Sequence, residues 1–511
     1  MKERFEMVAK TFQGLEDVLA DELKNLGAEN VEIGRRMVSF EGDLEMLYKA
    51  NMCCRTALRI LKPIYKFIAK DTDALYEMIK EYDWTQVLSL DKTFSIDSVV
   101  NSEEFSHSRF VTYRVKDAIV DFFKDKYGPD KRPGVRLQDA DVMINVHISG
   151  DRVTLSLDSS GESLHKRGYR VAQTDAPINE VLAAGIILKS GWKGDGPLVD
   201  PMCGSGTFLV EAALIAANIN PGIYRKSFAF EQWNDFDEEL FDRLYNDESQ
   251  EREFKFKIYG ADISPKAVAI AEKNVKQAGV AKYVDLQIKP IALWEEAPEN
   301  CFIITNPPYG ERISSDDMEG FYETIGAKLK HVFKGHAWII GYRDEYFKKI
   351  GLAPSSKTPI LNGALECELR EYVIFDGDYK SFRKGGGSIK VGDREERPER
   401  KGKIKRVSDR QWKEDARRKG MGGKEMRGPK PEKRSALEER YLAKPKGRAR
   451  REEKPEVVSE NPLAKRRNEG ALKTILGRTP SLPPAEGPFM RTRRGWKRPI
   501  EKGETNNNEN K

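Results

Sequence analysis

The sequence has few of the residues that bind metal ions or form disulfide bonds. Its 511 residues include five cysteines and five histidines. No two histidines have HExxH spacing, and the cysteines show neither zinc-site spacing nor the framework of a small secreted domain. The composition therefore predicts a protein without a metal centre that lives in a reducing compartment, the cytoplasm.

Long apolar segments are also missing. No uninterrupted hydrophobic run reaches the roughly 20 residues that span a bilayer. The first twenty residues, MKERFEMVAKTFQGLEDVLA, carry acidic side chains among the apolar ones and do not resemble a signal peptide. We therefore expect a cytoplasmic protein with no membrane partner.

The overall charge hides two regions of opposite sign. The formal net charge is +6, yet residues 381–511 hold 39 Lys and Arg against 20 Asp and Glu, whereas the first 380 residues hold 49 against 62. The second region also has a GGG run, scattered prolines and no sustained apolar period, which is typical of disorder. We expect a disordered basic tail that contacts nucleic acid, although a solvated solubility extension would have the same composition.

The N-terminal part has the mixed pattern of an α+β region. In the first fifty residues, short apolar strands flank a helix whose leucines recur at helical spacing and which ends at Gly27. The chain continues to about residue 158 with a strand at Thr93–Val100, a helix at Phe110–Lys126 and a hairpin closed around Ser149-Gly150.

A different rhythm begins near residue 165 and lasts to about residue 380. Short apolar strands in LVD, KIYGAD and CFIITN alternate with helices. This βαβ pattern is typical of the α/β class and predicts a mainly parallel sheet covered on both faces. The segment KTPILNGALECELREYVIF adds two strands around an Asn362-Gly363 turn, so we expect an antiparallel hairpin at the sheet edge.

The segment LVDPMCGSGTFLVEAAL joins the first of these strands to a helix. The strand ends at Asp200, and Gly204 and Gly206 precede a helix that begins near Thr207. Glycine lets the backbone approach a ligand closely, and free N–H groups at a helix start can meet a carboxylate. The spacing is neither G-x-G-x-x-G nor a P-loop. The Asp200-Pro201 pair points instead to S-adenosylmethionine.

Asp262 closes the next strand, in IYGADIS. An acid at this position can bind two ribose hydroxyls. It lies 62 residues after Asp200, instead of the roughly 20 usual in dinucleotide-binding folds, and an insertion at about 219–256 that contains FAFEQW accounts for the difference. Because Ser264-Pro265 begins a helix, Asp262 also fits the role of a helix N-cap.

The motif TNPPYGER, residues 305–312, ends the following strand at the edge where open α/β sheets bind ligands. The side-chain oxygen of Asn306 and the carbonyl of Pro307 can accept hydrogen bonds from an exocyclic amine and so aim its lone pair at a methyl group. Tyr309 can stack on a flipped base. Positioning can supply most of the acceleration without a metal. The simpler alternative is a turn after a strand, capped by the asparagine.

Together these segments resemble a known family. Asp200–Thr207, Asp262 and Asn306–Tyr309 are similar to the motifs of class I S-adenosylmethionine-dependent amino-methyltransferases, which act on DNA adenine N6 or on RNA adenine or guanine N2. The longer string LHKRGYR…APINEVLAAGIILKSGW, the FAFEQW insertion and NPPYGER resemble the THUMP-containing large-subunit rRNA guanine-N2 methyltransferases. The resemblance covers roughly residues 1–380.

The resemblance implies a domain order and an activity. It implies a ferredoxin-like segment at 1–50, a THUMP RNA-binding domain at 51–158 and a Rossmann-like class I methyltransferase domain at 159–380, followed by the tail at 381–511. It further implies transfer of a methyl group from S-adenosylmethionine to the N2 amine of a guanine in 23S rRNA. Structured rRNA would be the partner, with no metal and no membrane.

The resemblance also carries over site residues at the matching positions. The cofactor residues would be Pro177, Asn179, Glu180, Asp200, Pro201, Gly204, Gly206, Thr207, Asp262 and Ile263. The target-base residues would be Asn306, Pro307, Pro308 and Tyr309. In LHKRGYR, phosphate contacts would come from Lys166, Arg167 or Arg170, unless the segment is a solvated linker. The family's acid after the third strand is replaced here by Pro290 or Ile291, which leaves the contact to the cofactor adenine open.

Two other functions fit parts of the sequence. A DNA adenine-N6 methyltransferase would use the same amide chemistry, but the long N-terminal α+β region argues against it. A non-enzymatic RNA-binding assembly factor with a relic cofactor fold would not need the glycine loop, Asp262 and NPPY together. The target nucleotide, the oligomeric state and the role of the tail stay open.

Overall fold

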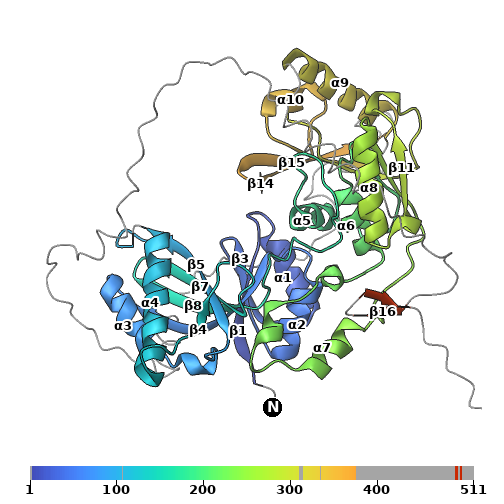
Figure 1. Ribbon diagram of the computed structural model, residues 1–511. Coiled ribbons are helices and arrows are strands. Elements are labelled where there is room, and N and C mark those ends of the chain that lie inside the picture. Colours follow the sequence, from blue (N-terminus) through green and yellow to red (C-terminus); the bar gives the residue numbers. More distant parts are fainter. Residues whose placement is uncertain are drawn as a thin grey trace, which may run out of the picture. The chain divides into compact units, whose positions relative to one another are not determined.

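The computed structural model describes residues 3–105, 107–309, 315–333, 335–375, 490–492 and 495–497. Two large sheets with their helices make up residues 3–375 (Figure 1). The predicted class, α+β units ahead of a Rossmann-like α/β domain, is confirmed. Among the described residues, no helix is long and apolar enough to cross a membrane.

The N-terminal part is built on one eight-stranded sheet with the order β2-β3-β1-β4-β8-β7-β5-β6. Its strands are β1 (Phe5–Lys10), β2 (Glu29–Gly34), β3 (Met37–Gly42), β4 (Arg59–Ile68), β5 (Thr93–Asn101), β6 (Gly134–Val135), β7 (Val142–Ser149) and β8 (Arg152–Asp158). Strand β4 pairs with β1 on one side and with β8 on the other, so one strand joins the two α+β units. Pro63, which has no N–H, lies in β4 at a register shift.

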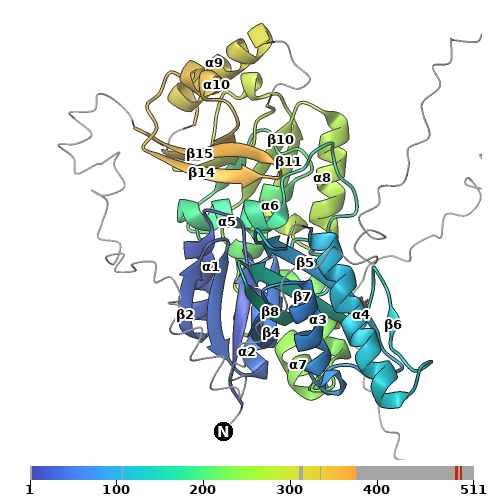
Figure 2. The same cartoon turned by 90° about the vertical axis from the view of Figure 1, so that its left-hand side faces the viewer.

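Four helices accompany this sheet. They are α1 (Glu16–Asn25), α2 (Leu44–Cys53), α3 (Thr72–Glu81) and α4 (Ser108–Tyr127). Asp43 and Asp71 cap α2 and α3 by accepting hydrogen bonds from backbone N–H groups of the first turn. Helix α3 packs against α4, and α4 packs on β5 (Figure 2). The strand and helix predicted between residues 93 and 126 are therefore confirmed, each with slightly longer bounds.

The second sheet has seven strands in the order β11-β10-β9-β12-β13-β15-β14. They are β9 (Leu198–Asp200), β10 (Ile258–Asp262), β11 (Val284–Ile288), β12 (Phe302–Thr305), β13 (Gly335–Gly341), β14 (Ser356–Asn362) and β15 (Leu365–Ile374). The first five strands in this order pair in parallel, and β15 pairs antiparallel with both β13 and β14. The mainly parallel sheet with an antiparallel edge hairpin is thus confirmed.

The hairpin turn differs slightly from its prediction. Asn362 pairs with Leu365, so the two turn residues are Gly363 and Ala364 rather than Asn362 and Gly363. Gly363 has φ +63°, a backbone conformation that glycine adopts at little cost. Asn362 is therefore the last residue of β14, and its side chain projects from a strand.

Six helices of the described residues accompany the second sheet. They are α5 (Glu180–Ser190), α6 (Thr207–Ala216), α7 (Glu238–Tyr245), α8 (Pro265–Gln277), α9 (Ser315–His331) and α10 (Asp344–Lys349). Helices α6 and α8 pack on β10, and α5 packs on α6. Short apolar strands followed by capped helices produce the rhythm seen in the sequence, as with Ser264 and Pro265 at the start of α8.

The insertion between α6 and β10 binds the N-terminal part. Tyr48 of α2 stacks on Phe230 with ring centroids 4.5 Å apart, and Phe241 of α7 meets its edge at 5.5 Å. The Tyr48 hydroxyl accepts a hydrogen bond from the Asp237 N–H at 2.9 Å. These aromatic side chains belong to one hydrophobic core that continues through both parts. The insertion predicted at about 219–256 therefore holds the two parts together.

The tail is described at only two short segments. Strands β16 (Met490–Thr492) and β17 (Gly495–Lys497) pair antiparallel and belong to a separate unit. The prediction of disorder for residues 381–511 otherwise lies outside the described residues. The same holds for the last three residues of NPPYGER, 310–312.

Candidate functional site

The three sequence motifs meet at neighbouring strand ends. Strand β9 lies between β10 and β12 in the parallel sheet. Asp200 ends β9, Asp262 ends β10, and Asn306 directly follows β12. Parallel strands end at the same edge of a sheet, which is where open α/β sheets bind ligands. The structure therefore brings the predicted cofactor and target-base residues together.

The loop from Pro201 to Thr207 needs its two glycines. Gly204 has φ +53° and Gly206 has φ +79°, a region that side chains with a Cβ rarely adopt. A Cβ at Gly206 would stand only 3.0 Å from the Ala271 Cβ of α8. Gly206 is also the N-cap of α6 and offers no side-chain cap. No side chain therefore caps the first-turn N–H groups of α6.

Asp262 holds the glycine loop. Its Oδ2 accepts a hydrogen bond from the Gly204 N–H at 3.0 Å, and its Oδ1 accepts one from the Ser264 N–H at 2.9 Å. The N-cap of α8 is Ser264, whose hydroxyl accepts from the Ala267 N–H. The alternative role of Asp262 as the N-cap of this helix is therefore wrong. Its half-buried carboxylate faces the glycine loop instead.

Asp200 lies behind the loop and is 1% exposed. Its Oδ1 accepts hydrogen bonds from the Thr305 hydroxyl at 2.8 Å and from the Met202 N–H at 3.2 Å. Burial raises the pKa of Asp200 to about 7. Asp200 thus ties the end of β9 to the end of β12. Sequence reasoning missed Thr305, although a threonine that ends the apolar run CFIIT is a visible signal.

The NPPY motif forms a corner after β12. Pro307 is buried and Pro308 is exposed, while Asn306 and Tyr309 are half-buried. The Tyr309 ring packs against the main hydrophobic core. Its hydroxyl donates a hydrogen bond to the Asn306 Oδ1 at 2.5 Å. Burial raises the pKa of Tyr309 above its usual range, so the hydroxyl keeps its proton.

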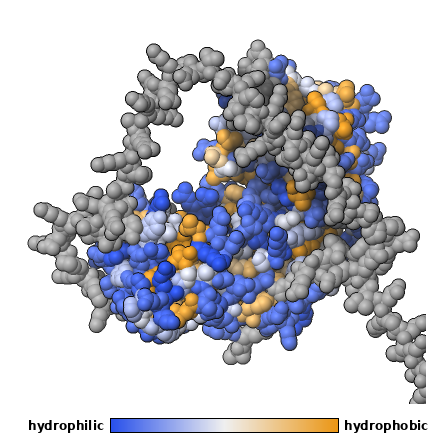
Figure 3. All heavy atoms as spheres, viewed as in Figure 1, coloured by the Kyte–Doolittle hydropathy of each residue, from blue (hydrophilic) through white to orange (hydrophobic). Residues whose placement is uncertain are grey.

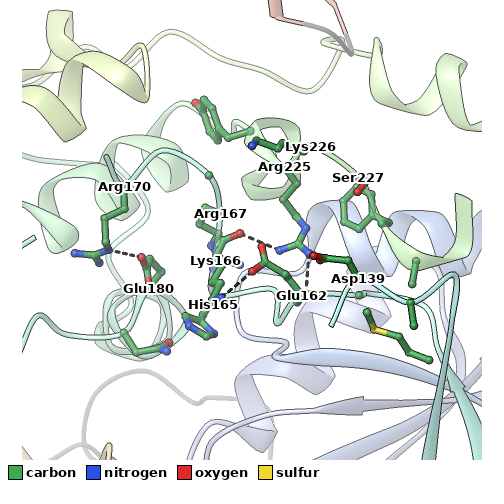
Figure 4. A pocket seen from close by; sticks show the side chains of 18 of the residues that line it. Asp139, Glu162, His165, Lys166, Arg167, Arg170, Glu180, Arg225, Lys226 and Ser227 are labelled. Atoms are coloured by element: carbon green, nitrogen blue, oxygen red, sulfur yellow. Dashed lines mark hydrogen bonds and ion pairs between the residues drawn. The ribbon is translucent and has the colours of Figure 1, made fainter. Parts of the chain in front are cut away.

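Arg170 differs from its predicted role in RNA contact. Its guanidinium donates a hydrogen bond to Glu180 Oε1 at 2.6 Å (Figure 4). It also donates to Ser205 Oγ and Thr207 Oγ1, at 2.9 Å in each case. These bonds occupy the guanidinium N–H groups of Arg170, so this side chain faces the glycine loop and not the solvent. Asn179 caps α5 through its side-chain oxygen. Asn179 and Glu180 therefore have local partners, and Arg170 links Glu180 to the loop.

Arg167 also differs from its predicted role. Its side chain is 2% exposed and pairs with the fully buried Glu211 of α6. It further donates to the carbonyl oxygens of Leu164 and Arg55. A guanidinium enclosed in this way cannot meet a phosphate, because the contact needs an accessible donor. Lys166, by contrast, is 58% exposed.

Asn274 is a site residue that sequence reasoning missed. Its side chain is buried in α8, where its Oδ1 accepts from the Val171 and Ala172 N–H groups. Its Nδ2 donates to the Ala172 and Ser205 carbonyls, at 2.9 Å in each case. The residue therefore joins the linker to the glycine loop. The available signal was an asparagine on the otherwise apolar face of α8.

A pocket of ≈ 920 Å³ lies where the N-terminal part, the linker and the insertion meet (Figure 4). Its lining includes Lys166 and Lys226, Asp139, and the predicted residues Pro177, Asn179 and Glu180. His165 also lines it, and burial lowers the pKa of this imidazole to about 4. The pocket therefore combines exposed cations with a neutral imidazole.

Family models match the chain in the order seen in the structure. The RlmL ferredoxin-like domain matches residues 6–61, the THUMP domain matches residues 69–158, and the RMKL-like, methyltransferase domain matches residues 167–371. These ranges cover most of residues 3–375.

Relatives match about seven tenths of this chain. Ribosomal RNA large subunit methyltransferase K/L of Syntrophotalea carbinolica is 39% identical over 380 residues, which make up 71% of this chain and 52% of that protein. A Synechocystis protein assigned to the RNA methyltransferases, slr0064, is 38% identical over 371 residues, 72% of this chain and 96% of that protein. The chain thus spans about half the length of the K/L relatives it matches.

A solved structure agrees with the sequence matches. SMU.472, described as a methyltransferase complexed with SAH, superposes with a TM-score of 0.66 at 31% identity over 74% of this chain and 100% of that chain. The chain belongs to the family of RMKL-like methyltransferases with ferredoxin-like and THUMP domains, and the family resemblance identified in the sequence is confirmed.

Proposed function

We propose that this chain is an S-adenosylmethionine-dependent RNA methyltransferase that modifies the N2 amine of a guanine in 23S rRNA. The observation that carries the proposal is the meeting of the Gly204 loop, Asp262 and Asn306 at neighbouring strand ends. The name of the Syntrophotalea relative supports the rRNA substrate, and the SAH bound to SMU.472 supports the cofactor. In this proposal residues 1–158 capture RNA and residues 159–380 transfer the methyl group.

The residues at the strand ends fit S-adenosylmethionine, which supplies an electrophilic methyl group when bound. Asp262 accepts two backbone bonds and keeps lone pairs for ribose hydroxyls. Ile263 and Ile288, 72% and 60% exposed at the ends of adjacent strands, offer apolar surface for adenine. The Cβ that Gly204 lacks would fill space 3.8 Å from the Thr174 hydroxyl. The first-turn N–H groups of α6, which no side chain caps, would bind the methionine carboxylate.

Asn306 and Pro307 would act on the base. The exocyclic amine of guanine is a poor nucleophile because its lone pair is delocalised into the ring. Asn306 Oδ1 and the Pro307 carbonyl each accept one N–H of this amine, which favours a more tetrahedral nitrogen and aims its lone pair at the methyl group. This role requires positioning and no charged base.

Replacing Asp262 by alanine should weaken S-adenosylmethionine binding by at least roughly 1.5 kcal/mol, since a hydrogen bond to a charged group contributes about that much. Calorimetric titration of the full chain measures the effect. Asp285→Ala is the matched control, because this exposed carboxylate lies at the opposite end of the neighbouring strand β11. Equal affinity of the Asp262 variant and the parent would remove Asp262 from the cofactor site.

We also propose that RNA lies across the pocket. Lys166 pairs with Glu162, and both side chains are more than half exposed, so the pair is weak and a phosphate can replace it. Lys226 is exposed on the same pocket. Hydrophilic residues also dominate the face of the described part seen in Figure 3. Exposed cations beside the catalytic domain are the expected feature of a backbone contact.

The double variant Lys166→Ala/Lys226→Ala should bind rRNA fragments more weakly and lower the slope of log affinity against log salt by about 0.7–0.9 per cation removed. Filter binding at several salt concentrations measures the slope. Lys24→Ala, an exposed lysine on α1, is the matched control. A parental slope in the double variant would exclude these lysines from the RNA contact.

The product of the reaction tests the function directly. The purified full chain is incubated with S-adenosylmethionine and large-subunit rRNA that lacks the modification, and the nucleosides are separated by mass spectrometry. We expect N2-methylguanosine. An N6-methyladenosine product would show that the chain is an adenine-N6 methyltransferase instead. The absence of any methylated nucleoside would favour the non-enzymatic RNA-binding alternative.

A further inference from the structure

Three side chains form a hydrogen-bonded chain from the edge hairpin to the target-base residue. Asn362, at the end of β14, donates from Nδ2 to the Tyr309 hydroxyl at 3.2 Å. Tyr309 in turn donates to Asn306 Oδ1 at 2.5 Å. Asn362 lies 53 residues beyond Tyr309 in the sequence, so only the fold brings them together.

The direction of these bonds follows from the chemistry of a phenol. Tyr309 has one hydroxyl hydrogen, and burial keeps it on the oxygen by raising the pKa of the group. Asn362 Nδ2 can only donate, so the phenol oxygen accepts from it and the single hydrogen remains for Asn306. Bonds in such a chain strengthen one another, because each polarises the next.

The orientation of the Asn306 amide decides whether it can accept a hydrogen bond from the target amine. Its oxygen accepts hydrogen bonds and its NH2 group only donates. If the amide turned over, the NH2 group would meet the N–H donors of the target amine. The Tyr309 hydrogen bond favours the orientation in which Oδ1 is the acceptor. Oδ1 has two lone pairs, so it can accept from Tyr309 and from the target amine together.

We propose that Asn362 is a positioning residue that orients the Asn306 amide through the Tyr309 hydroxyl. The proposal rests on the proposed function of Asn306 as acceptor of the target amine. It assigns a role in the methyl-transfer step to the antiparallel hairpin β14–β15, which none of the strand-end motifs includes. It also gives the Tyr309 hydroxyl a role that is separate from stacking by its ring.

The test is a double-mutant cycle in single-turnover methyl transfer with saturating cofactor and with rRNA varied up to saturation. Asn362→Ala and Tyr309→Phe should each slow transfer by about 3- to 10-fold, the equivalent of one neutral hydrogen bond, with unchanged KM for rRNA. The double variant should be no slower than Tyr309→Phe alone, because Asn362 acts only through the hydroxyl. A residue that merely stabilises the hairpin would give no such coupling.

Asn362→Asp separates orientation from loss of bulk. The carboxylate has the same size but accepts the Tyr309 hydrogen and draws it away from Asn306, so this variant should be slower than Asn362→Ala. Ala364→Gly, in the turn of the same hairpin, is the matched control and should keep the parental rate. Parental melting temperatures would show that the hairpin is intact.

Additive effects of Asn362→Ala and Tyr309→Phe, or a parental rate for Tyr309→Phe, would overturn the proposal. A different methylated nucleoside would refute the guanine assignment alone, because the cycle can be measured on that product. If the parent methylates no RNA, a crystal structure of Asn362→Asp with SAH decides. If the Tyr309 hydroxyl donates to the carboxylate that Asn362→Asp introduces, and no longer to Asn306, the positioning role is supported. An unchanged Tyr309–Asn306 bond would refute it.

Discussion

Replacing Asn306 by alanine is expected to slow methyl transfer by at least ~100-fold, comparable to the loss of one preorganised polar contact in a transition state. Binding of S-adenosylmethionine should stay near the parental level, because the glycine loop is held by Asp262 and not by Asn306. Single-turnover transfer to unmodified rRNA measures the first quantity, and calorimetric titration measures the second. A slower transfer rate with unchanged cofactor affinity indicates a residue that acts on the base.

Two variants sharpen this expectation. Asn306→Asp keeps an acceptor of the same size and should retain more activity than Asn306→Ala. Asn246→Ala, in which an exposed asparagine after α7 loses only a bond to its own helix, should behave as the parent. Full activity of Asn306→Ala would contradict the amide mechanism, whichever base is methylated.

The parts of the fold that follow from local patterns were predictable. The presence of Gly363 in the edge turn, the Ser264-Pro265 helix start and the alternation of strands with helices all depend on neighbouring residues. The role of β4 did not follow from the sequence. Its register with β1 and β8 joins segments about 50 and 90 residues away, and no local pattern shows that one strand serves two units.

The sequence predicted those site residues whose positions follow from the ends of the parallel strands. Asp200, Asp262 and Asn306 meet because parallel strands end at one edge. Their partners were not predictable, since Thr305, Asn274 and Asn362 act through contacts that only packing creates. Polar residues on apolar faces were the visible signal, but a sequence does not say which partner satisfies them.

The basic linker LHKRGYR shows a second limit. Lys166 and Arg167 are adjacent cations, yet one is 58% exposed and the other 2%. Charge alone predicts a solvent-facing contact, because isolated charges are rarely buried. The exception needs a buried partner, and Glu211 lies 44 residues away in the interior of α6. The buried and the exposed basic residues of such a run therefore have to be distinguished before any of them is assigned to RNA binding.

Arg167→Ala is expected to lower the free energy of unfolding by about 3–5 kcal/mol, because it leaves the buried Glu211 carboxylate without its opposite charge. The variant also loses the bond from Arg167 to the Arg55 carbonyl, which connects the linker to the N-terminal part. Urea unfolding measures the change. Lys166→Ala is the matched control, and its exposed side chain should change the free energy by no more than about 0.5 kcal/mol.

The pH dependence of this loss identifies its cause. Burial raises the pKa of Glu211, and Arg167 opposes that rise. Without Arg167 the folded-state pKa moves further above the unfolded value of about 4.3, so stability is lost as pH rises through the folded pKa. The difference between Arg167→Ala and the parent should therefore be smallest near pH ~4 and grow toward pH ~8. In Arg167→Ala/Glu211→Gln the titrating group is gone, and this growth should disappear. A loss of equal size at every pH in the single variant would show that the uncompensated Glu211 charge is not its source.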